Sequence, residues 1–318
     1  MVSHNIAIIS SKSLSKSGGI LSVTQTLFSS IFPIYYLNEE TNLEMQLADV
    51  RAVVFSGFDQ IFVKLARHLK GRGKKIVVIW HFSSASEVDP DIGAAWRALL
   101  PLLSEHLIDL FVTCKKDFDI VASNLFRIPT FFLMNNAFET SFADIPKCGL
   151  GIYSGSSDYW IKNLRPNLYA ALMTGLPVDI LPYDSTLQGI VEGLQKTDFV
   201  TGISDRVDHD TFMMRLASRE LISYVTFSEC GPIIPLEALN NGVICLTGNN
   251  HHYFEEDSRL KSFLVINRPD DPYAIYQSIV TALENKREII GRYKIWKFQY
   301  DEKQQANFEQ FIDLITSL

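Results

Sequence analysis

Two glutamates, Glu229 and Glu237, are the residues whose type and spacing point most directly to chemistry. They lie eight positions apart in SECGPIIPLEALNNGVICLTG (228–248), a stretch that otherwise looks built for burial. A carboxylate in apolar surroundings is costly unless it is paired or hydrogen-bonded. The pair could accept hydrogen bonds from sugar hydroxyls, or it could form the acid and base of a glycoside hydrolase.

The residues around the two glutamates predict a strand, a loop and a helix. The run YVTFS (224–228) predicts a strand, with Glu229 in the loop immediately after it. Residues 235–241 predict a helix, because proline suits a first turn and Gly242 can end the helix. Glu237 then lies in the first turn, where the helix dipole favours an ionised carboxylate.

We expect the backbone amides of Gly231, Ile233 and Ile234 to face the same side of the site as the two carboxylates. A loop that leads into a helix N-terminus suits a phosphate group. One segment could therefore offer amide donors for phosphates and carboxylate acceptors for hydroxyls.

Short apolar runs alternate with longer amphipathic segments along the whole chain. The runs that predict strands are 5–10, 33–37, 51–58, 74–82, 109–114 and 130–134, followed by 149–154, 177–183, 198–203, 224–228, 243–248 and 263–267. Repeated strand–helix alternation indicates parallel sheets with helices on both faces. The sequence therefore predicts an α/β protein with two doubly wound, Rossmann-like domains.

We expect an N-terminal domain at 1–137, a C-terminal domain at 138–290 and a helical tail at 291–318 that packs back on the N-terminal domain. We expect one helix over 272–294, which crosses from the C-terminal domain into the tail, and after it a polar helix that reaches Leu318. Ligands of open parallel sheets bind outside the carboxyl ends of the strands. Two such sheets facing each other would form a cleft.

The composition indicates an ordinary globular protein, with 47% hydrophobic residues, 20% charged residues and a net charge of −7. The acidic balance, without zinc-ligand spacing or a basic stripe, argues against nucleic-acid binding. One local basic cluster, KLARHLKGRGKK (64–75), is either a solvated helix end or a contact with an anionic membrane surface.

The chain is expected to be cytoplasmic, with peripheral attachment to the inner face of the membrane as an alternative. Its apolar runs are too short to cross a bilayer, and its start lacks the pattern of a signal peptide. Four cysteines without a CxxC pair predict buried, reduced thiols. The pair His251-His252 is expected in a solvated loop, because no neighbouring ligands complete a metal site.

The stretch FSECGPIIPLEALNNGVICL resembles the E-x7-E signature of GT-B glycosyltransferases of the large GT4 type. The common form in that family is P-S-x-x-E-G-F-G-L-P-x-x-E-A-M-A-x-G-x-P-V-V. The similarity in layout covers most of the chain, although only residues 198–248 match specifically. Other matched positions are Gly18-Gly19 after the first strand and His81 after a mid-domain strand. Asn135-Asn136 is a weaker match to an Asn-Gly pair that opens the second domain, and Lys162 matches a lysine after the first strand of that domain.

The resemblance implies a role for each matched residue. Glu237 would accept hydrogen bonds from the ribose hydroxyls of a sugar nucleotide, and Glu229 would hold hydroxyls of the transferred sugar. Lys162 would neutralise the diphosphate together with the amides of Gly18-Gly19 and of Gly231, Ile233 and Ile234. Fixed donors there lower the barrier, since negative charge accumulates as the glycosidic bond breaks. His81 would touch the transferred sugar or the acceptor.

The segment after residue 198 is similar to the part of the family that carries the nucleotide base, which makes Ser204 and Arg206 candidates for donor binding. One departure is Gly155-Ser156, where the family has a glycine followed by a diphosphate-binding arginine. A missing bidentate cation removes a strong phosphate contact. Arg165 or Arg206 is expected to compensate, or turnover is weak.

The resemblance thus implies a retaining, metal-independent glycosyltransferase of the hexosyltransferase type, without a cofactor. It would move a sugar from a nucleotide sugar of unknown base to a glycan or lipid-linked acceptor, as in the synthesis of bacterial surface polysaccharide or glycoconjugates. Two alternatives stay open. One is a non-catalytic GT-B subunit that binds a partner or glycan, and the other is a glycoside hydrolase.

Overall fold

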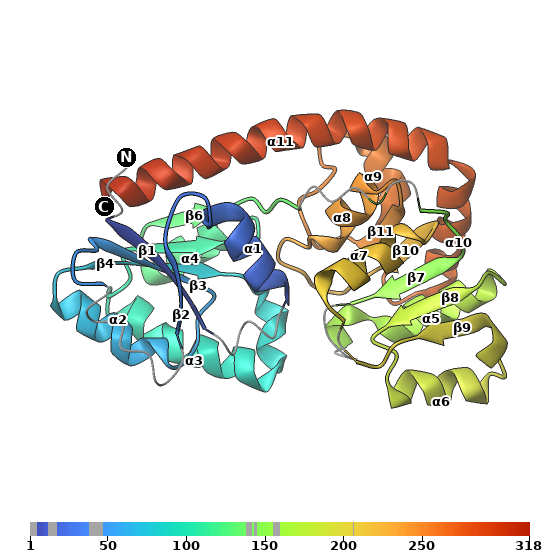
Figure 1. Ribbon diagram of the computed structural model, residues 1–318, viewed down its shortest axis with the longest axis horizontal. Coiled ribbons are helices and arrows are strands. Elements are labelled where there is room, and N and C mark those ends of the chain that lie inside the picture. Colours follow the sequence, from blue (N-terminus) through green and yellow to red (C-terminus); the bar gives the residue numbers. More distant parts are fainter. Residues whose placement is uncertain are drawn as a thin grey trace. The chain divides into compact units, whose positions relative to one another are not determined.

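The computed structural model describes residues 5–11, 18–37, 47–137, 142, 145–154, 160–205 and 207–318. The chain divides into two compact units. Unit 1 comprises residues 1–136 and 302–318, and unit 2 comprises residues 137–301. Each unit contains one six-stranded sheet with helices packed on both of its faces (Figure 1).

The sheet of unit 1 has the order β2-β1-β3-β4-β5-β6, and every neighbouring pair is parallel. Its strands are β1 (Ile6–Ser11), β2 (Ile34–Leu37), β3 (Ala52–Ser56), β4 (Lys75–Trp80), β5 (Leu110–Thr113) and β6 (Thr130–Phe132). Its helices are α1 (Gly18–Phe28), α2 (Phe62–Gly71), α3 (Pro90–Ser104) and α4 (Phe118–Phe126). The chain turns back across the sheet after β2, so β1 and β3 flank the point where the winding reverses.

The apolar residues of the four central strands, β1, β3, β4 and β5, are buried on both faces, whereas those of the edge strand β6 are half-buried. Alternate residues, such as Ile9, Phe55 and Trp80, join one core cluster with side chains of α2, α3 and α4. On α1, Phe28 lies against Phe308 and Phe311 of the C-terminal segment, with ring centroids 5.8 and 6.1 Å away. Burial on both faces explains why these strands are continuous apolar runs in the sequence.

The sheet of unit 2 has the order β12-β11-β10-β7-β8-β9 and is also parallel throughout. Its strands are β7 (Leu150–Tyr153), β8 (Val178–Leu181), β9 (Val200–Gly202), β10 (Leu221–Tyr224), β11 (Ile244–Gly248) and β12 (Val265–Ile266). Its helices are α5 (Leu164–Met173), α6 (Ser185–Gly193), α7 (His209–Ala217), α8 (Ile234–Asn240), α9 (Ser258–Leu264) and α10 (Pro272–Glu284). Counted within the unit, this is the strand order 3-2-1-4-5-6 of dinucleotide-binding folds, whose topological switch point lies between β7 and β10.

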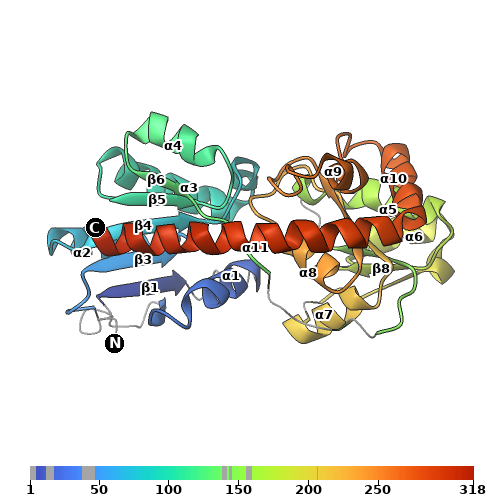
Figure 2. The same ribbon diagram turned by 90° about the horizontal axis from the view of Figure 1, so that it is seen from above.

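The last helix, α11 (Lys286–Ser317), is 32 residues long and continuous (Figure 2). The expected single helix from 272 to 294 is therefore wrong. Asn285 separates α10 from α11, because its backbone (φ −103°, ψ 17°) departs from the helical conformation. Its side-chain amide donates to the carbonyl of Thr281 in the last turn of α10.

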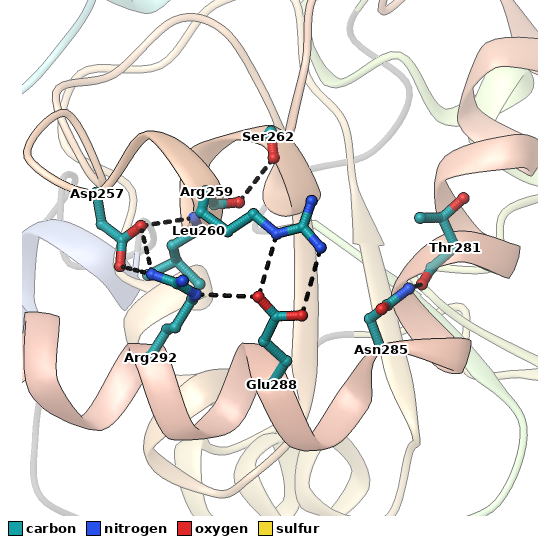
Figure 3. Close-up of polar contacts among 8 residues, drawn as sticks. All are labelled: Asp257, Arg259, Leu260, Ser262, Thr281, Asn285, Glu288 and Arg292. Carbon is teal, nitrogen blue, oxygen red and sulfur yellow. Dashed lines mark hydrogen bonds and ion pairs between the residues drawn. The ribbon is translucent and has the colours of Figure 1, made fainter.

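The first turns of α11 are tied to α9 by an alternating chain of charges (Figure 3). Arg292 bridges Asp257 and Glu288, and Glu288 also binds Arg259 at 3.1 Å. The α11 residues up to Asp301 belong to unit 2, and those from Glu302 belong to unit 1. One helix therefore supplies side chains to the cores of both units.

The prediction of two parallel, doubly wound α/β domains is confirmed, and most expected strands lie within two residues of the observed bounds. Two smaller expectations are wrong. Cys148 is exposed, whereas Cys114, Cys230 and Cys245 are buried free thiols. His252 is buried, because its ring packs against Tyr253 and Tyr300 instead of entering solvent.

Carboxylates of unit 1 neutralise much of the basic cluster at 64–75. Arg67 pairs with Glu105 at 2.5 Å, and Lys70 and Lys75 pair with Asp109 at 2.7 and 3.4 Å. This geometry favours the interpretation as a solvated helix end. In the part of the chain that the structure describes, no helix is both long and apolar enough to cross a membrane.

Candidate functional site

The site of unit 2 is organised by the segment that follows β10. The strand ends at Tyr224, so Glu229 lies five residues beyond it and not immediately after it as expected. The strand ends early because the backbone N–H of Val225 donates to Asn167 Oδ1, and that of Phe227 donates to the carbonyl of Ile161. The segment leaves the sheet ladder and runs beside residues 161–167.

Two asparagines hold this segment in place. Asn163 and Asn167 both donate from Nδ2 to the carbonyl of Val225, at 3.0 and 2.9 Å. Asn163 has a left-handed backbone (φ 55°) between the short 3₁₀ turn Trp160–Lys162 and α5, and it also binds the carbonyl of Pro269. Lys162 is thereby fixed next to the segment that carries Glu229.

Lys162, Glu229 and Tyr224 form one compact polar cluster. Lys162 Nζ lies 2.7 Å from Glu229 Oε1, and the Tyr224 hydroxyl donates to the same oxygen at 2.6 Å. Both side chains of the ion pair are largely shielded, with exposed fractions of 15% and 13%. Burial raises the pKa of Tyr224 well above its usual range, and the Glu229 carboxylate raises it further, so the phenol keeps its proton and donates.

Glu237 lies in the first turn of α8, as predicted, and is only 3% exposed. Pro235 is in the same turn, and Gly242 follows the helix with φ 66°, a left-handed conformation that glycine adopts without strain. His209, the first residue of α7, places Nε2 at 3.3 Å from Glu237 Oε1. This hydrogen bond is the main reason why the pKa of His209 is raised.

Gly231 is buried and Ile233 and Ile234 are half-buried in the loop that leads into α8. Ile233, the N-cap residue of α8, makes no side-chain capping hydrogen bond. Ser204 is exposed and follows β9, two strands away from β7. The remaining candidates of this unit, Gly155 and Arg206, lie outside the described residues, as does Ser156.

The candidates of unit 1 lie at the carboxyl edge of its own sheet. Gly18 and Gly19 are the first two residues of α1, and His81 follows β4 directly. His81 Nε2 is 3.0 Å from Ser56 Oγ, and Nδ1 is 3.6 Å from Cys114 Sγ. Both ring nitrogens are therefore engaged within unit 1.

The direction of this chain of hydrogen bonds can be assigned. Thr24 Oγ1 donates to the carbonyl of Ile20, so it accepts from Ser56 Oγ, which lies 2.7 Å away. Ser56 must then accept from His81 Nε2–H, which leaves Nδ1 to accept from Cys114. His81 thus anchors α1 to the sheet edge, and this arrangement favours a positioning role over contact with a sugar.

The structure brings two sequence candidates of unit 2, Lys162 and Glu229, into direct contact, whereas Glu237, in the first turn of α8, contacts His209. The sequence analysis did not identify Tyr224, which it placed in a strand, or His209 as site residues. It also missed the asparagines at 163 and 167. Their spacing of four at a helix start was the signal available, because residues i and i+4 share a helix face. No group of three or more metal-binding side chains occurs in the described ranges.

Comparison with solved structures shows the GT-B fold. A glycosyltransferase from Rickettsia africae ESF-5 superimposes with a TM-score of 0.67 and 7% identity over 98% of this chain and 97% of its own. The α,α-trehalose-phosphate synthase (UDP-forming) from Burkholderia vietnamiensis gives a TM-score of 0.64 and 10% identity over 98% and 100% of the two chains.

A chain of the GtfA/B complex gives a TM-score of 0.59 and 13% identity over 86% of this chain. This chain spans only 59% of the length of that relative. No family model matches the sequence, and no curated protein matches it. At such low identities the likeness establishes the fold alone.

Proposed function

We propose that this protein is a glycosyltransferase that moves a sugar from a nucleoside diphosphate sugar to a glycan or lipid-linked acceptor. The observation that carries the proposal is the Lys162–Glu229 pair, at 2.7 Å, beside the switch point of a sheet with dinucleotide-binding strand order. Ligands of such sheets bind at that point. The fold, shared with glycosyltransferases that include a UDP-forming synthase, supports the same assignment.

Each polar group has a role in this proposal. The Lys162 ammonium neutralises charge that develops on the departing diphosphate, and the amides of Gly231, Ile233 and Ile234 supply further donors. Glu229 accepts hydrogen bonds from hydroxyls of the transferred sugar, and the buried carboxylate of Glu237 accepts them from the ribose. His81 acts through α1, whose first residues are Gly18 and Gly19.

We further propose that the enzyme is a retaining hexosyltransferase of the GT4 type that needs no metal. Lys162 and the backbone amides supply the positive charge that a metal supplies elsewhere. The synthesis of a surface polysaccharide or glycoconjugate is the process that such an activity would serve. The matched E-x7-E stretch, with Glu229 in a loop and Glu237 in a first helical turn, supports this finer assignment.

A panel of UDP-, GDP- and ADP-sugars tests the proposal. We expect one of them to raise the melting temperature and to release its nucleoside diphosphate when a suitable acceptor is present. Glu229→Gln should keep nucleotide binding and lose transfer by at least about 10-fold, because the amide replaces an acceptor of sugar hydroxyls by a donor. Failure of all three donor classes to bind would contradict the proposal.

The glycoside hydrolase alternative fits the geometry less well. A general acid must donate a proton. Glu229 instead accepts hydrogen bonds from Lys162 and Tyr224. Glu237 contacts the imidazole of His209, and this contact raises the pKa of that ring. Release of sugar from simple glycosides without any nucleotide would revive this alternative.

The non-catalytic subunit is the second candidate, and Gly155-Ser156 is the observation that favours it. Ser156 cannot form the two charged hydrogen bonds to a diphosphate that an arginine at this position would form. Nucleotide binding without transfer, with activity appearing only when a second protein is added, would support this candidate against the enzyme.

A further inference from the structure

Lys162 has two competing partners if the proposed function holds. Its ammonium is now paired with Glu229 Oε1 at 2.7 Å. A diphosphate carries more negative charge than one carboxylate and offers several acceptor oxygens, so it draws the ammonium toward itself. Glu229, whose side chain is only 13% exposed, then loses its cationic partner at the moment when it must hold the sugar. A shielded carboxylate that loses its partner is costly and moves toward solvent.

The hydrogen bond from Tyr224 opposes movement of the Glu229 carboxylate toward solvent. The Tyr224 hydroxyl donates at 2.6 Å to the same oxygen that Lys162 binds, and the phenol keeps its proton because burial and the neighbouring carboxylate both oppose its ionisation. Lys162 Nζ itself lies 3.5 Å from the hydroxyl. The donor to Glu229 therefore remains when the ammonium leaves.

The Tyr224 ring cannot follow Lys162. It is the last residue of β10, in register with Thr247 of β11, and it is 5% exposed. The ring belongs to a core cluster with Ile222, Ala238 and Cys245. A hydroxyl on such a fixed ring defines one position for Glu229 Oε1 in both states of the site.

We propose that Tyr224 is a positioning residue that holds Glu229 in place while the diphosphate takes Lys162. This inference rests on the proposed function and adds a change of partner to it. In the empty site, Glu229 is shared by Lys162 and Tyr224. In the donor complex, Lys162 binds the diphosphate, and Tyr224 continues to orient Glu229 toward the transferred sugar.

Tyr224→Phe tests this inference, because phenylalanine keeps the packed ring and removes only the donor. Tyr153→Phe is the matched control: it removes another buried hydroxyl–carboxylate bond of unit 2, the one to Asp179. For Y224F we expect the Kd of the nucleoside diphosphate alone to change by less than about 3-fold. We expect kcat to fall about 10-fold or more, the size expected from loss of a hydrogen bond to a charged group.

A purely structural role would lower the melting temperatures of both variants without this separation of binding from turnover. A crystal structure of Y224F with bound nucleoside diphosphate gives a second readout, in which Glu229 should have left its position beside residue 224. A kcat within 2-fold of wild type, or an unmoved Glu229 in that complex, would overturn the inference while the proposed function stands. If the wild type binds no UDP-, GDP- or ADP-sugar, the proposed function fails first and this inference falls with it.

Discussion

At the scale of single residues, unit 2 shields several carboxylates from solvent, and each lies against a donor. Glu229 faces Lys162 and Tyr224, and Glu237 faces His209. A third, Asp179, has no role in the proposed chemistry and shows what such pairing does for stability. It is 1% exposed and accepts from the Tyr153 hydroxyl and the Arg215 guanidinium.

Replacing Asp179 by asparagine should destabilise unit 2 by about 3 kcal/mol, because it leaves the Arg215 charge without its partner. Urea unfolding measures this loss. Asp270→Asn, at an exposed position, is the control and should change the free energy of unfolding by less than about 0.5 kcal/mol. A loss in D179N no larger than that of the control would show that the buried pair contributes nothing.

The His209–Glu237 contact predicts a dependence of stability on pH. The pKa of His209 is raised in the folded state, so its contribution is complete below the unfolded pKa of about 6.5 and is lost as pH rises through the higher folded value. Asp208 and Asp210 also face the imidazole and act in the same direction. The gain stays below about 1 kcal/mol, because the ring is 41% exposed.

The measurement is the difference in unfolding free energy between the wild type and His209→Gln at pH 5.5 and pH 9. We expect the difference to be larger at pH 5.5. Equal differences at the two pH values would mean that the imidazole gains nothing from Glu237.

At the scale of elements, the alternation of apolar runs predicted the parallel sheets, because strands buried on both faces are apolar throughout. It could not predict where β10 ends. Residues 225–228 are as apolar as the strand itself, and the strand stops only because Asn163 and Asn167 take up the next backbone groups. Side-chain contacts across more than fifty positions leave no periodic signal. For the same reason Tyr224 was expected to begin a strand, although it ends β10 and its hydroxyl reaches Glu229.

Substitutions of Asn163 test whether this residue shapes the end of β10. Glycine and alanine at this position separate the effect of its side-chain hydrogen bonds from that of its left-handed backbone. Asn163→Gly keeps the left-handed backbone (φ 55°) and removes the bonds to Val225 and Pro269. Asn163→Ala removes the same bonds and adds backbone strain, so it should be less stable than N163G by about 1 kcal/mol. Thermal unfolding of both variants measures the difference. Equal stabilities would mean that the backbone at residue 163 is not held in this conformation.

At the scale of the whole molecule, the alternation of apolar and amphipathic segments predicted two α/β domains. Of the predicted site residues in unit 2, Lys162 and Glu229 lie in contact. The sequence predicted a helical tail that packs back on the N-terminal domain, but not that one continuous 32-residue helix contributes to both units, because the expected break lay near residue 294 and not at Asn285. Residues 302–318 complete the core of unit 1. Phe311 is fully buried there, 5.7 Å from the ring of Phe131.

Phe311→Ala should therefore destabilise unit 1 by about 3–4 kcal/mol and leave unit 2 unchanged. Hydrogen exchange of amides in β1–β6 and in β7–β12 distinguishes the two units. Phe298→Ala on the same helix is the control, since that ring is 66% exposed and should matter little. Equal loss of protection in both sheets would contradict the assignment of this segment to unit 1.

The central claim is that Lys162 and its neighbours hold the diphosphate of an activated sugar. Calorimetric titration of UDP, GDP and ADP into the wild type and Lys162→Met tests it most directly, with Lys196→Met, at an exposed position, as the control. We predict that one nucleotide binds the wild type and K196M equally and binds K162M at least about 10-fold more weakly, a difference of about 1.4 kcal/mol. Binding to K162M as tight as to the wild type, or no binding by any of the three nucleotides, would contradict the account.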